Sequence, residues 1–272
     1  MANQLSSLFK RSVGYGRVRS QWFFQKMYFH AIYGMNYSSP NHFENGEKEA
    51  MRYASHRLHG QKQYTTVIFD VGANIGEYAK DIRKVFGDSA KIFCFEPGAA
   101  TFEQLQQNIQ SDSGTSAHRF GLGETEGAFT LFYDQPASTI ASLHDLPSDH
   151  PWKGDRTEQV QVRTIDNFCK DEGIAHIHFL KVDVEGHELQ VLRGASEMIN
   201  SDKVDYVQFE FGFRQMDSKG YFRDFYNLLH ERYNLFRIVQ DGVYPISTYH
   251  ESLEVFVGVS NFLAERRSLD QI

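Results

Sequence analysis

The chain has 272 residues, with 28 Lys and Arg against 35 Asp and Glu, which gives a formal net charge of −7. Hydrophobic residues make up 41% and charged residues 23%, so a mostly disordered or collagen-like chain is excluded. The acidic balance argues against sequence-independent nucleic-acid binding, which needs clustered Lys and Arg. No apolar run reaches the ~18 residues of a membrane-spanning helix, so we expect no integral membrane association.

Two features of the chain predict a cytoplasmic protein. The N-terminal segment alternates basic and polar residues and has no apolar stretch of the secretory kind. The two cysteines, Cys94 and Cys169, do not form a C-x-x-C pair, which argues against a cysteine zinc site. Two buried thiols in a reducing compartment are the simplest interpretation.

The first ~60 residues differ from the rest, because they are rich in aromatic residues and lack strand-like apolar runs. We expect one or two helices over 1–60, acting as a cap or as an oligomer contact of a possible homodimer. A single larger domain would then occupy 61–272. The basic, aromatic stretch could also touch a membrane surface, but an amphipathic helix docked on the core is the favoured interpretation.

Beyond residue 65, short apolar runs alternate with helical patterns. The predicted strand and helix pairs are 66–70 with 77–86, 91–96 with 101–109, 178–183 with 187–198, and 204–211 with 221–232. This alternation predicts an α/β fold with a mostly parallel sheet and helices on both faces. The last apolar runs, 235–239 and 253–259, predict an antiparallel pair at the sheet edge. The polar stretch 129–162 is typical of an irregular substrate-binding loop.

The sharpest motif joins the first predicted strand to its helix, with the sequence DVGANIGE over 70–77. Its two glycines allow a tight turn and a close approach of the backbone to a ligand, and the helix N-terminus offers amides to an anionic group. The candidate cofactor-binding residues of this loop are Asp70, Gly72, Ala73, Asn74 and Gly76.

The charge and spacing of this loop favour S-adenosylmethionine over NAD. The G-x-x-x-G spacing lacks one glycine of the dinucleotide fingerprint, and Asp70 would repel a pyrophosphate but balance an ammonium or a sulfonium. Glu96, which Pro97 holds at the tip of the second strand, is placed to accept hydrogen bonds from ribose hydroxyls. Glu96 would serve NAD equally well. Gly121 either flanks an adenine ring or forms an ordinary turn.

A third motif, FLKVDVEGHE over 179–188, places ionisable groups after a buried strand. Asp183, Glu185 and His187 are the candidate catalytic residues, and Asp183 also counts among the cofactor-binding ones. His187 is either a general base or a helix-start residue bonded to a carboxylate. A divalent ion held by these three residues with Glu210 is disfavoured, so we expect no metal.

The chain resembles the FkbM family of S-adenosylmethionine-dependent methyltransferases in six motifs that follow the family order. They are DVGANIGEY (70–78), FEP (95–97), GLGETEG (121–127), VRTIDNFC (162–169), FLKVDVEGHELQVLRGA (179–195) and VQFEFG (207–212). The resemblance implies a Rossmann-like methyltransferase fold with a seven-stranded sheet and a reversed edge strand. It also implies O-methylation of a hydroxyl on a sugar, glycan or related metabolite.

The resemblance assigns roles to the motif residues. It implies that Asp70, Gly72, Asn74 and Gly76 line the methionine end of the cofactor, that Glu96 holds the ribose, and that Asp183, Glu185 and His187 face the transferred methyl group. Two other classes stay open at this point. They are an NAD-dependent oxidoreductase and a non-catalytic cofactor-binding protein of the same fold.

Overall fold

The computed structural model describes residues 14–37, 45–59, 65–147, 150 and 153–267. Within them, the main sheet has eight strands in the order β10-β9-β11-β8-β7-β1-β2-β3. The strands are β1 (Val67–Val71), β2 (Lys91–Phe95), β3 (Thr115–His118), β7 (Ile177–Val182), β8 (Val204–Gly212), β9 (Tyr233–Val239), β10 (Gly242–Ile246) and β11 (Val259–Arg266). The neighbouring strands β8, β7, β1, β2 and β3 are all parallel to one another. Their carboxyl ends therefore meet at one edge of the sheet.

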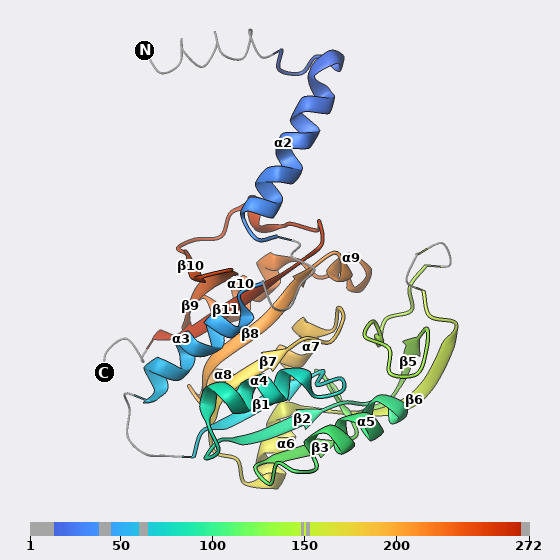
Figure 1. Cartoon of the computed structure of the whole chain (residues 1–272), viewed down its shortest axis with the longest axis vertical. Helices are drawn as coiled ribbons and strands as arrows, with labels where there is room; N and C mark the ends of the chain where they lie inside the picture. The colour runs from blue at the N-terminus through green and yellow to red at the C-terminus, as the bar shows by residue number, and fades with distance from the viewer. Residues whose placement is uncertain (1–13, 38–44, 60–64, 148–149, 151–152, 268–272) are drawn as a thin grey trace.

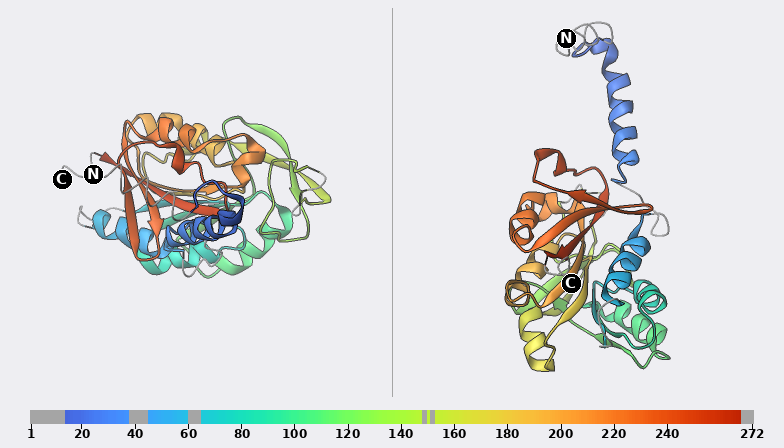
Figure 2. Two further views of the ribbon diagram at one scale, coloured as in Figure 1. Left: turned by 90° about the horizontal axis from the view of Figure 1, so that it is seen from above. Right: turned by 90° about the vertical axis from the view of Figure 1, so that its left-hand side faces the viewer.

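Helices cover both faces of the main sheet (Figures 1 and 2). One face packs against α3 (Glu47–His59), α4 (Glu77–Phe86) and α5 (Ala99–Ile109). The other face packs against α6 (Ile165–Glu172), α7 (Glu188–Arg193), α8 (Ser196–Asn200) and α10 (Phe222–Leu229). Each strand therefore sends alternate side chains into two separate apolar cores, as expected of a doubly covered parallel sheet.

The predicted fold class is confirmed, but the strand count and the end of the chain are corrected. The sheet has eight strands rather than seven. The edge strand β10 is reversed, as predicted, and a second reversed strand, β11, lies inside the sheet between β8 and β9. The apolar run 253–259 is not a strand, because it packs against the core as irregular chain after the 3₁₀ turn η2 (Glu251–Leu253). Pairing begins only at Val259.

A second, three-stranded sheet corrects the prediction for 129–162. It consists of β4 (Gly121–Leu122), β5 (Gly127–Tyr133) and β6 (Arg156–Arg163), in the order β4-β6-β5. Strands β5 and β6 pair antiparallel along their whole length, so both ends of the predicted irregular stretch are strands. Sequence reasoning missed β6 because its alternation of polar and apolar residues looks polar on average. The loop between these strands remains irregular where it is described.

The N-terminal segment is helical, as predicted, but its two helices behave differently. Helix α3 docks on the sheet and buries Ala50, Met51 and Ala54 completely. Helix α2 (Gln21–Gly34), which follows the 3₁₀ turn η1 (Val18–Ser20), projects away from the body (Figures 1 and 2). The favoured interpretation of the basic, aromatic stretch, an amphipathic helix docked on the core, is therefore wrong for α2.

Both cysteines, Cys94 and Cys169, are buried and unpaired, as predicted. Among the helices of the described residues, none combines the length and the apolar character needed to cross a bilayer. Helix α9 (Arg214–Ser218), which follows β8, completes the described elements and lies at the same sheet edge as the predicted site (Figure 1).

Candidate active site

The β1–α4 loop is shaped by glycines that bring it against the end of β7. Gly72 has φ +76°, and a Cβ atom there would lie 1.8 Å from the carbonyl oxygen of Asp183. No other residue fits this position without moving the backbone. The amides of Gly72 and Ala73 donate to the carbonyl of Phe95 at 3.0 and 3.1 Å, which fixes the loop to β2. Gly76 is the N-cap residue of α4, and in the described structure no side chain caps this helix.

Glu96, at the tip of β2, ties two loops together. One of its oxygens accepts the amide of Asn74 at 3.2 Å, and the other accepts the amide of Gly98 at 2.9 Å. Burial raises the pKa of Glu96 to about 7, although these two amides act in the opposite direction. Pro97 lies beside Gly121, where a Cβ atom would be 3.8 Å from the proline ring. The structure thus brings the predicted cofactor-binding residues of β1, β2 and β4 into one region.

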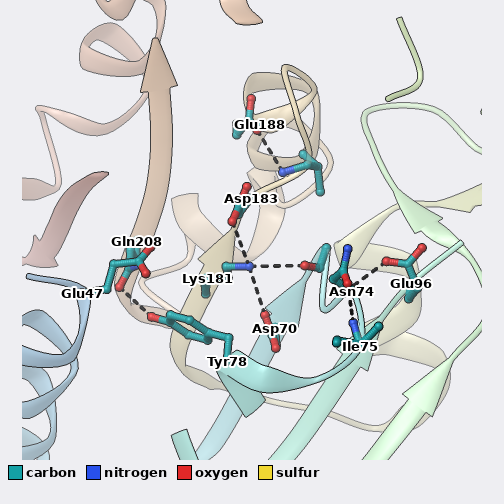
Figure 3. Close-up of polar contacts among 12 residues, drawn as sticks. Glu47, Asp70, Asn74, Ile75, Tyr78, Glu96, Lys181, Asp183, Glu188 and Gln208 are labelled. Carbon is teal, nitrogen blue, oxygen red and sulfur yellow. Dashed lines mark hydrogen bonds and ion pairs between the residues drawn. The ribbon is translucent and has the colours of Figure 1, made fainter. Parts of the chain in front are cut away.

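Asp70 lies beneath the surface of this region, ion-paired with a lysine that sequence reasoning did not assign. Asp70 and Lys181 face each other in register on β1 and β7, and Asp70 is fully buried. The Lys181 ammonium lies 3.4 Å from Asp70 and 3.4 Å from Asp183, and it donates to the carbonyl of Gly72 at 3.3 Å (Figure 3). Burial opposes the charge of Lys181, but the neighbouring carboxylates outweigh it and raise its pKa. Any influence of Asp70 on a ligand therefore passes through Lys181 and the loop backbone.

The same network continues into the N-terminal helix α3 (Figure 3). Tyr78 donates to the side-chain oxygen of Gln208 at 2.8 Å, and Gln208 donates to Glu47 of α3 at 3.2 Å. The Lys181 ammonium lies 5.0 Å from the ring centroid of Tyr78. The predicted N-terminal segment thus supplies a buried carboxylate to the surroundings of the site. Lys181 gave a signal in the sequence, as a charged residue inside the apolar run of β7, whereas Glu47 gave none.

The β7–α7 loop is fastened from within by Glu188. This fully buried carboxylate accepts the amides of Val184 and Gly186 at 2.9 and 3.1 Å and the side-chain amide of Gln215 at 2.5 Å. Burial raises the pKa of Glu188 to about 7, against the effect of the amides. The loop it holds turns through Glu185 at φ +54°. Glu188 therefore positions the loop that carries the candidate catalytic residues.

The three candidate catalytic residues have different partners. The Asp183 side chain is 26% exposed and contacts Lys181, whereas Glu185 forms an ion pair with the buried Arg214 at 2.8 Å. Burial and the charge of Asp183 raise the pKa of Glu185 to about 8, and Arg214 acts in the opposite direction. Of the three, Asp183 is thus the carboxylate that stands at the carboxyl end of a central strand beside the glycine loop.

His187 is buried and pairs with His144 of the β5–β6 loop. Its Nδ1 lies 3.3 Å from Nε2 of His144, and a Cβ atom on Gly123 would lie 2.9 Å from its Nε2. Burial, helped by His144, lowers the pKa of His187 to about 4, so the ring is neutral at pH 7. Neither of the predicted environments, a general base facing the site or a bond to a carboxylate, describes this packing between two loops.

Asp183 instead has a carboxylate neighbour on β8. One oxygen each of Asp183, Glu188 and Glu210 lies within 4.8 Å of the other two. Burial and the charge of Asp183 raise the pKa of Glu210 well above its ordinary value. Because Glu188 is occupied with the loop amides, the pair that faces the sheet edge is Asp183 beside Glu210, whose raised pKa favours the protonated carboxyl group. Of the four residues considered as ligands of a divalent ion, Asp183 and Glu210 thus lie close together. Glu185 and His187 contact other partners.

Comparison with known proteins settles the family. The model of the methyltransferase FkbM domain matches residues 70–238. The chain belongs to the FkbM methyltransferases. Of the three functions that the sequence left open, this confirms the methyltransferase, and its methyl donor is S-adenosylmethionine.

Curated relatives of this FkbM methyltransferase align with part of the chain. It is 32% identical to Methyltransferase 1 of Beauveria bassiana, over 61% of this chain and 70% of the relative. It is 27% identical to the hexuronic acid methyltransferase AglP of Haloferax volcanii, over 61% and 64%. It is 23% identical to the 2-O-methyltransferase NoeI of Sinorhizobium fredii, over 53% and 63%. The alignments thus span 63–70% of the length of these relatives.

The residues of this chain fit the donor. The uncapped first turn of α4 leaves amides for an anionic carboxylate. Each Glu96 oxygen accepts one amide and retains a lone pair for a hydroxyl group. Asp183 adds a partly exposed carboxylate within the same region, which suits a cationic group.

The β5–β6 loop of the FkbM methyltransferase bridges the two halves of the site. The side chain of Asn74 donates to the carbonyl of Ser138 at 3.2 Å, and the hydroxyl of Ser142 donates to the carbonyl of Glu185 at 2.8 Å. Both serines are buried. The loop therefore contacts the β1–α4 loop at one end and the β7–α7 loop at the other, next to a small pocket. That pocket is lined among others by Gly98, Thr101, Leu131, Tyr133, Ser138 and Glu158.

The raised pKa of Glu96 predicts a pH-dependent affinity for the donor. Ribose hydroxyls donate to the ionised carboxylate, so binding competes with the protonation of Glu96, whose pKa is about 7. We expect the affinity to be flat above pH 7 and to fall below it by up to about tenfold per pH unit. Calorimetric titration with S-adenosylhomocysteine between pH 5.5 and 8 measures this. In Glu96→Gln the affinity should be lower than that of the wild type at pH 8 and nearly independent of pH. A pH profile like that of the wild type would contradict the assignment of Glu96 as the carboxylate that binds the ribose.

Proposed function

We propose that this methyltransferase transfers a methyl group to a hydroxyl of a sugar, glycan or related metabolite. The observation that carries the proposal is the partly exposed Asp183 at the carboxyl end of β7, held by Lys181 and next to Glu210. A partly exposed carboxylate of this kind is suited to receive a hydroxyl proton. The names of two relatives, a hexuronic acid methyltransferase and a 2-O-methyltransferase, support a sugar acceptor.

The donor would be held by the residues at the carboxyl ends of β1 and β2. The backbone of the β1–α4 loop from Gly72 to Gly76, with Ala73 and Asn74, surrounds the methionine end, and Glu96 binds the ribose. Pro97 and Gly121 flank the adenine side. Asp183 faces the positively charged end, and Asp70 acts from below through Lys181. When bound, S-adenosylmethionine supplies an electrophilic methyl group on a cationic sulfur.

Asp183 would orient the acceptor and take its proton. The acceptor hydroxyl would donate a hydrogen bond to an Asp183 oxygen, and that oxygen would take the proton as the methyl group leaves the sulfur and bonds to the acceptor oxygen. The Lys181 ammonium, 3.4 Å away, holds the Asp183 side chain in place. Glu210, whose pKa is raised well above its ordinary value, can donate a hydrogen bond from its protonated form to Asp183 or to the acceptor. Alignment of the reactants and exclusion of water by the β5–β6 loop complete the contribution of the protein.

Glu185 and His187 are the other two candidates for a catalytic role that the sequence predicts. A single substitution distinguishes the role of His187 from that of Asp183. We expect His187→Ala to lower kcat by less than about tenfold and to leave donor affinity nearly unchanged, because its neutral ring packs between two loops and does not meet the acceptor. Initial rates with calorimetric Kd values measure this. A loss of about 10²-fold or more would make His187 the base instead.

A mass-spectrometric assay tests the proposed function. Purified protein is incubated with S-adenosylmethionine and a panel of acceptors that contains uronic acids, neutral glycans and amine-bearing controls. The proposal predicts a product heavier by one CH₂ group among the uronic acids or neutral glycans, with the methyl group located on oxygen by NMR. Methylation of the amine controls alone, or of no hydroxylated acceptor, would contradict it.

A further inference from the structure

Helix α2 exposes six large apolar side chains among its 14 residues. The exposed members are Trp22, Phe23, Met27, Tyr28, Phe29 and Tyr33, of which Trp22 is 70% and Tyr33 57% exposed. Of the helix residues, all of which are described, Ile32 alone is buried. The helix stands clear of the body in Figure 1 and in the right-hand view of Figure 2. Apolar patches of this kind mark surfaces that are covered by a partner or a membrane.

The apolar side chains of α2 surround the helix instead of forming a stripe. At 100° per residue, Trp22, Phe23 and Tyr28 point to three different sides. A protein partner, including a second copy of the chain, would cover one side and leave the others in water. A helix that is apolar all round needs an environment that covers it on all sides, as lipid does. The helix is only ~21 Å long, so it is too short to cross a ~30 Å hydrocarbon core.

The charge of the chain is divided in a way that suits an anionic surface. Five basic and no acidic residues precede Glu44, which leaves 23 Lys and Arg against 35 Asp and Glu in the remainder, a net charge of −12. Arg17 and Arg19 lie directly before α2, and Lys26 lies on it, with its ammonium 5.7 Å from the Trp22 ring. An anionic membrane attracts this end and repels the body. Tryptophan, tyrosine and basic side chains are the residues that favour the headgroup region.

The C-terminal end of α2 is fixed to the catalytic domain. The side chain of Asn36 donates to the carbonyls of Asn45 and Ile238 at 2.8 and 3.1 Å. Tyr37 is buried, and the guanidinium of Arg237 lies 4.7 Å from the centroid of its ring. The orientation of α2 is therefore set by the sheet. We propose that α2, with Arg17 and Arg19, embeds in the headgroup region of an anionic phospholipid membrane and holds the catalytic domain at its surface.

Co-sedimentation of the full chain with vesicles tests this proposal. We expect binding to vesicles of phosphatidylcholine with 30% phosphatidylglycerol, and at least tenfold weaker binding to pure phosphatidylcholine, with a marked loss at high salt. The triple variant Trp22→Ser/Phe23→Ser/Phe29→Ser should lose at least tenfold in affinity. So should Arg17→Glu/Arg19→Glu. These positions are exposed, so the variants should fold and retain the donor affinity of the wild type.

Matched controls separate this surface from others of the same chemistry. Tyr244→Ser removes a side chain that is 60% exposed on β10, and Lys91→Glu/Lys203→Glu changes the net charge by as much as the arginine variant. Both should bind vesicles like the wild type. Sedimentation velocity without vesicles should give a monomer. The proposal is overturned if the wild type ignores anionic vesicles, if both vesicle types bind equally, or if the wild type is a dimer that the serine variant dissociates.

Discussion

Asp183→Asn is expected to lower kcat by about 10²- to 10⁴-fold, the usual contribution of a positioned proton acceptor. Asparagine keeps the shape of the side chain but cannot take the proton of the acceptor hydroxyl. Donor affinity should change by less than about tenfold, because the β1–α4 loop and Glu96 still hold most of the molecule. Single-turnover rates with a methyl-accepting glycan, together with calorimetric Kd values, separate the two effects.

Two further variants make the test of Asp183 specific. Asp145→Asn, on the exposed part of the β5–β6 loop, should turn over at the wild-type rate. Glu210→Gln should retain most activity, because Glu210 is protonated and glutamine also donates a hydrogen bond. If Asp183→Asn kept wild-type turnover while Glu210→Gln lost it, the proton acceptor would be Glu210.

Lys181→Met is expected to destabilise the protein by about 3–5 kcal/mol, since it removes one partner from a buried ion pair. Asp70 would keep no cation within reach in a position that is fully buried, and the repulsion between Asp70 and Asp183 would no longer be offset. Urea denaturation followed by circular dichroism gives the free energy of unfolding.

A double variant, Lys181→Met/Asp70→Asn, tests whether the loss of stability comes from the charge that remains on Asp70. Because this charge is removed in the double variant, we expect it to recover at least half of the lost stability. Lys84→Met is the matched surface control, because Lys84 is solvent-exposed and its pair with Asp81 should contribute little to stability. A Lys181→Met protein as stable as Lys84→Met would show that Lys181 does not hold the centre of the sheet.

The strands and helices that carry the β1–α4 loop and Glu96 were predictable, because their hydrophobic patterns depend only on residues close together in the sequence. The helix over 77–86 was predicted with its observed bounds, and the first strand was shifted by one residue. In contrast, the predicted helix 187–198 is two helices, α7 and α8, separated by a turn at Gly194. Prediction failed where the structure depends on contacts between segments that are distant in sequence. The position of β11 between β8 and β9 is one example.

In the candidate site, too, some residues were predictable from the sequence and others were not. The residues of the glycine loop, Glu96 and Asp183 were placed together by the rule that carboxyl ends of parallel strands meet at one edge. The partners of Asp70 and Asp183 were not, because Lys181 was treated as part of an apolar strand. Its position follows from the period of two in β7, which puts Phe179, Lys181 and Asp183 on one face. Glu47 could not be inferred, since only the docking of α3 brings it to Gln208.

The environment of His187 was also beyond the sequence. Its neutral, buried state depends on His144, which lies 43 residues away in an irregular loop. An isolated histidine titrates near neutral pH, so the sequence supported a general base. The packing between two loops lowers that pKa and shifts the expected role to Asp183.

The place of the methyl donor is tested most directly by paired calorimetric titrations of the wild type and Glu96→Ala with S-adenosylhomocysteine and with NAD. We expect the wild type to bind S-adenosylhomocysteine and not NAD, and Glu96→Ala to bind it at least about tenfold more weakly, through the loss of hydrogen bonds to a charged group. A wild-type protein that binds NAD and not S-adenosylhomocysteine, or a Glu96→Ala variant with undiminished affinity, would contradict the placement of the donor between the β1–α4 loop and Glu96.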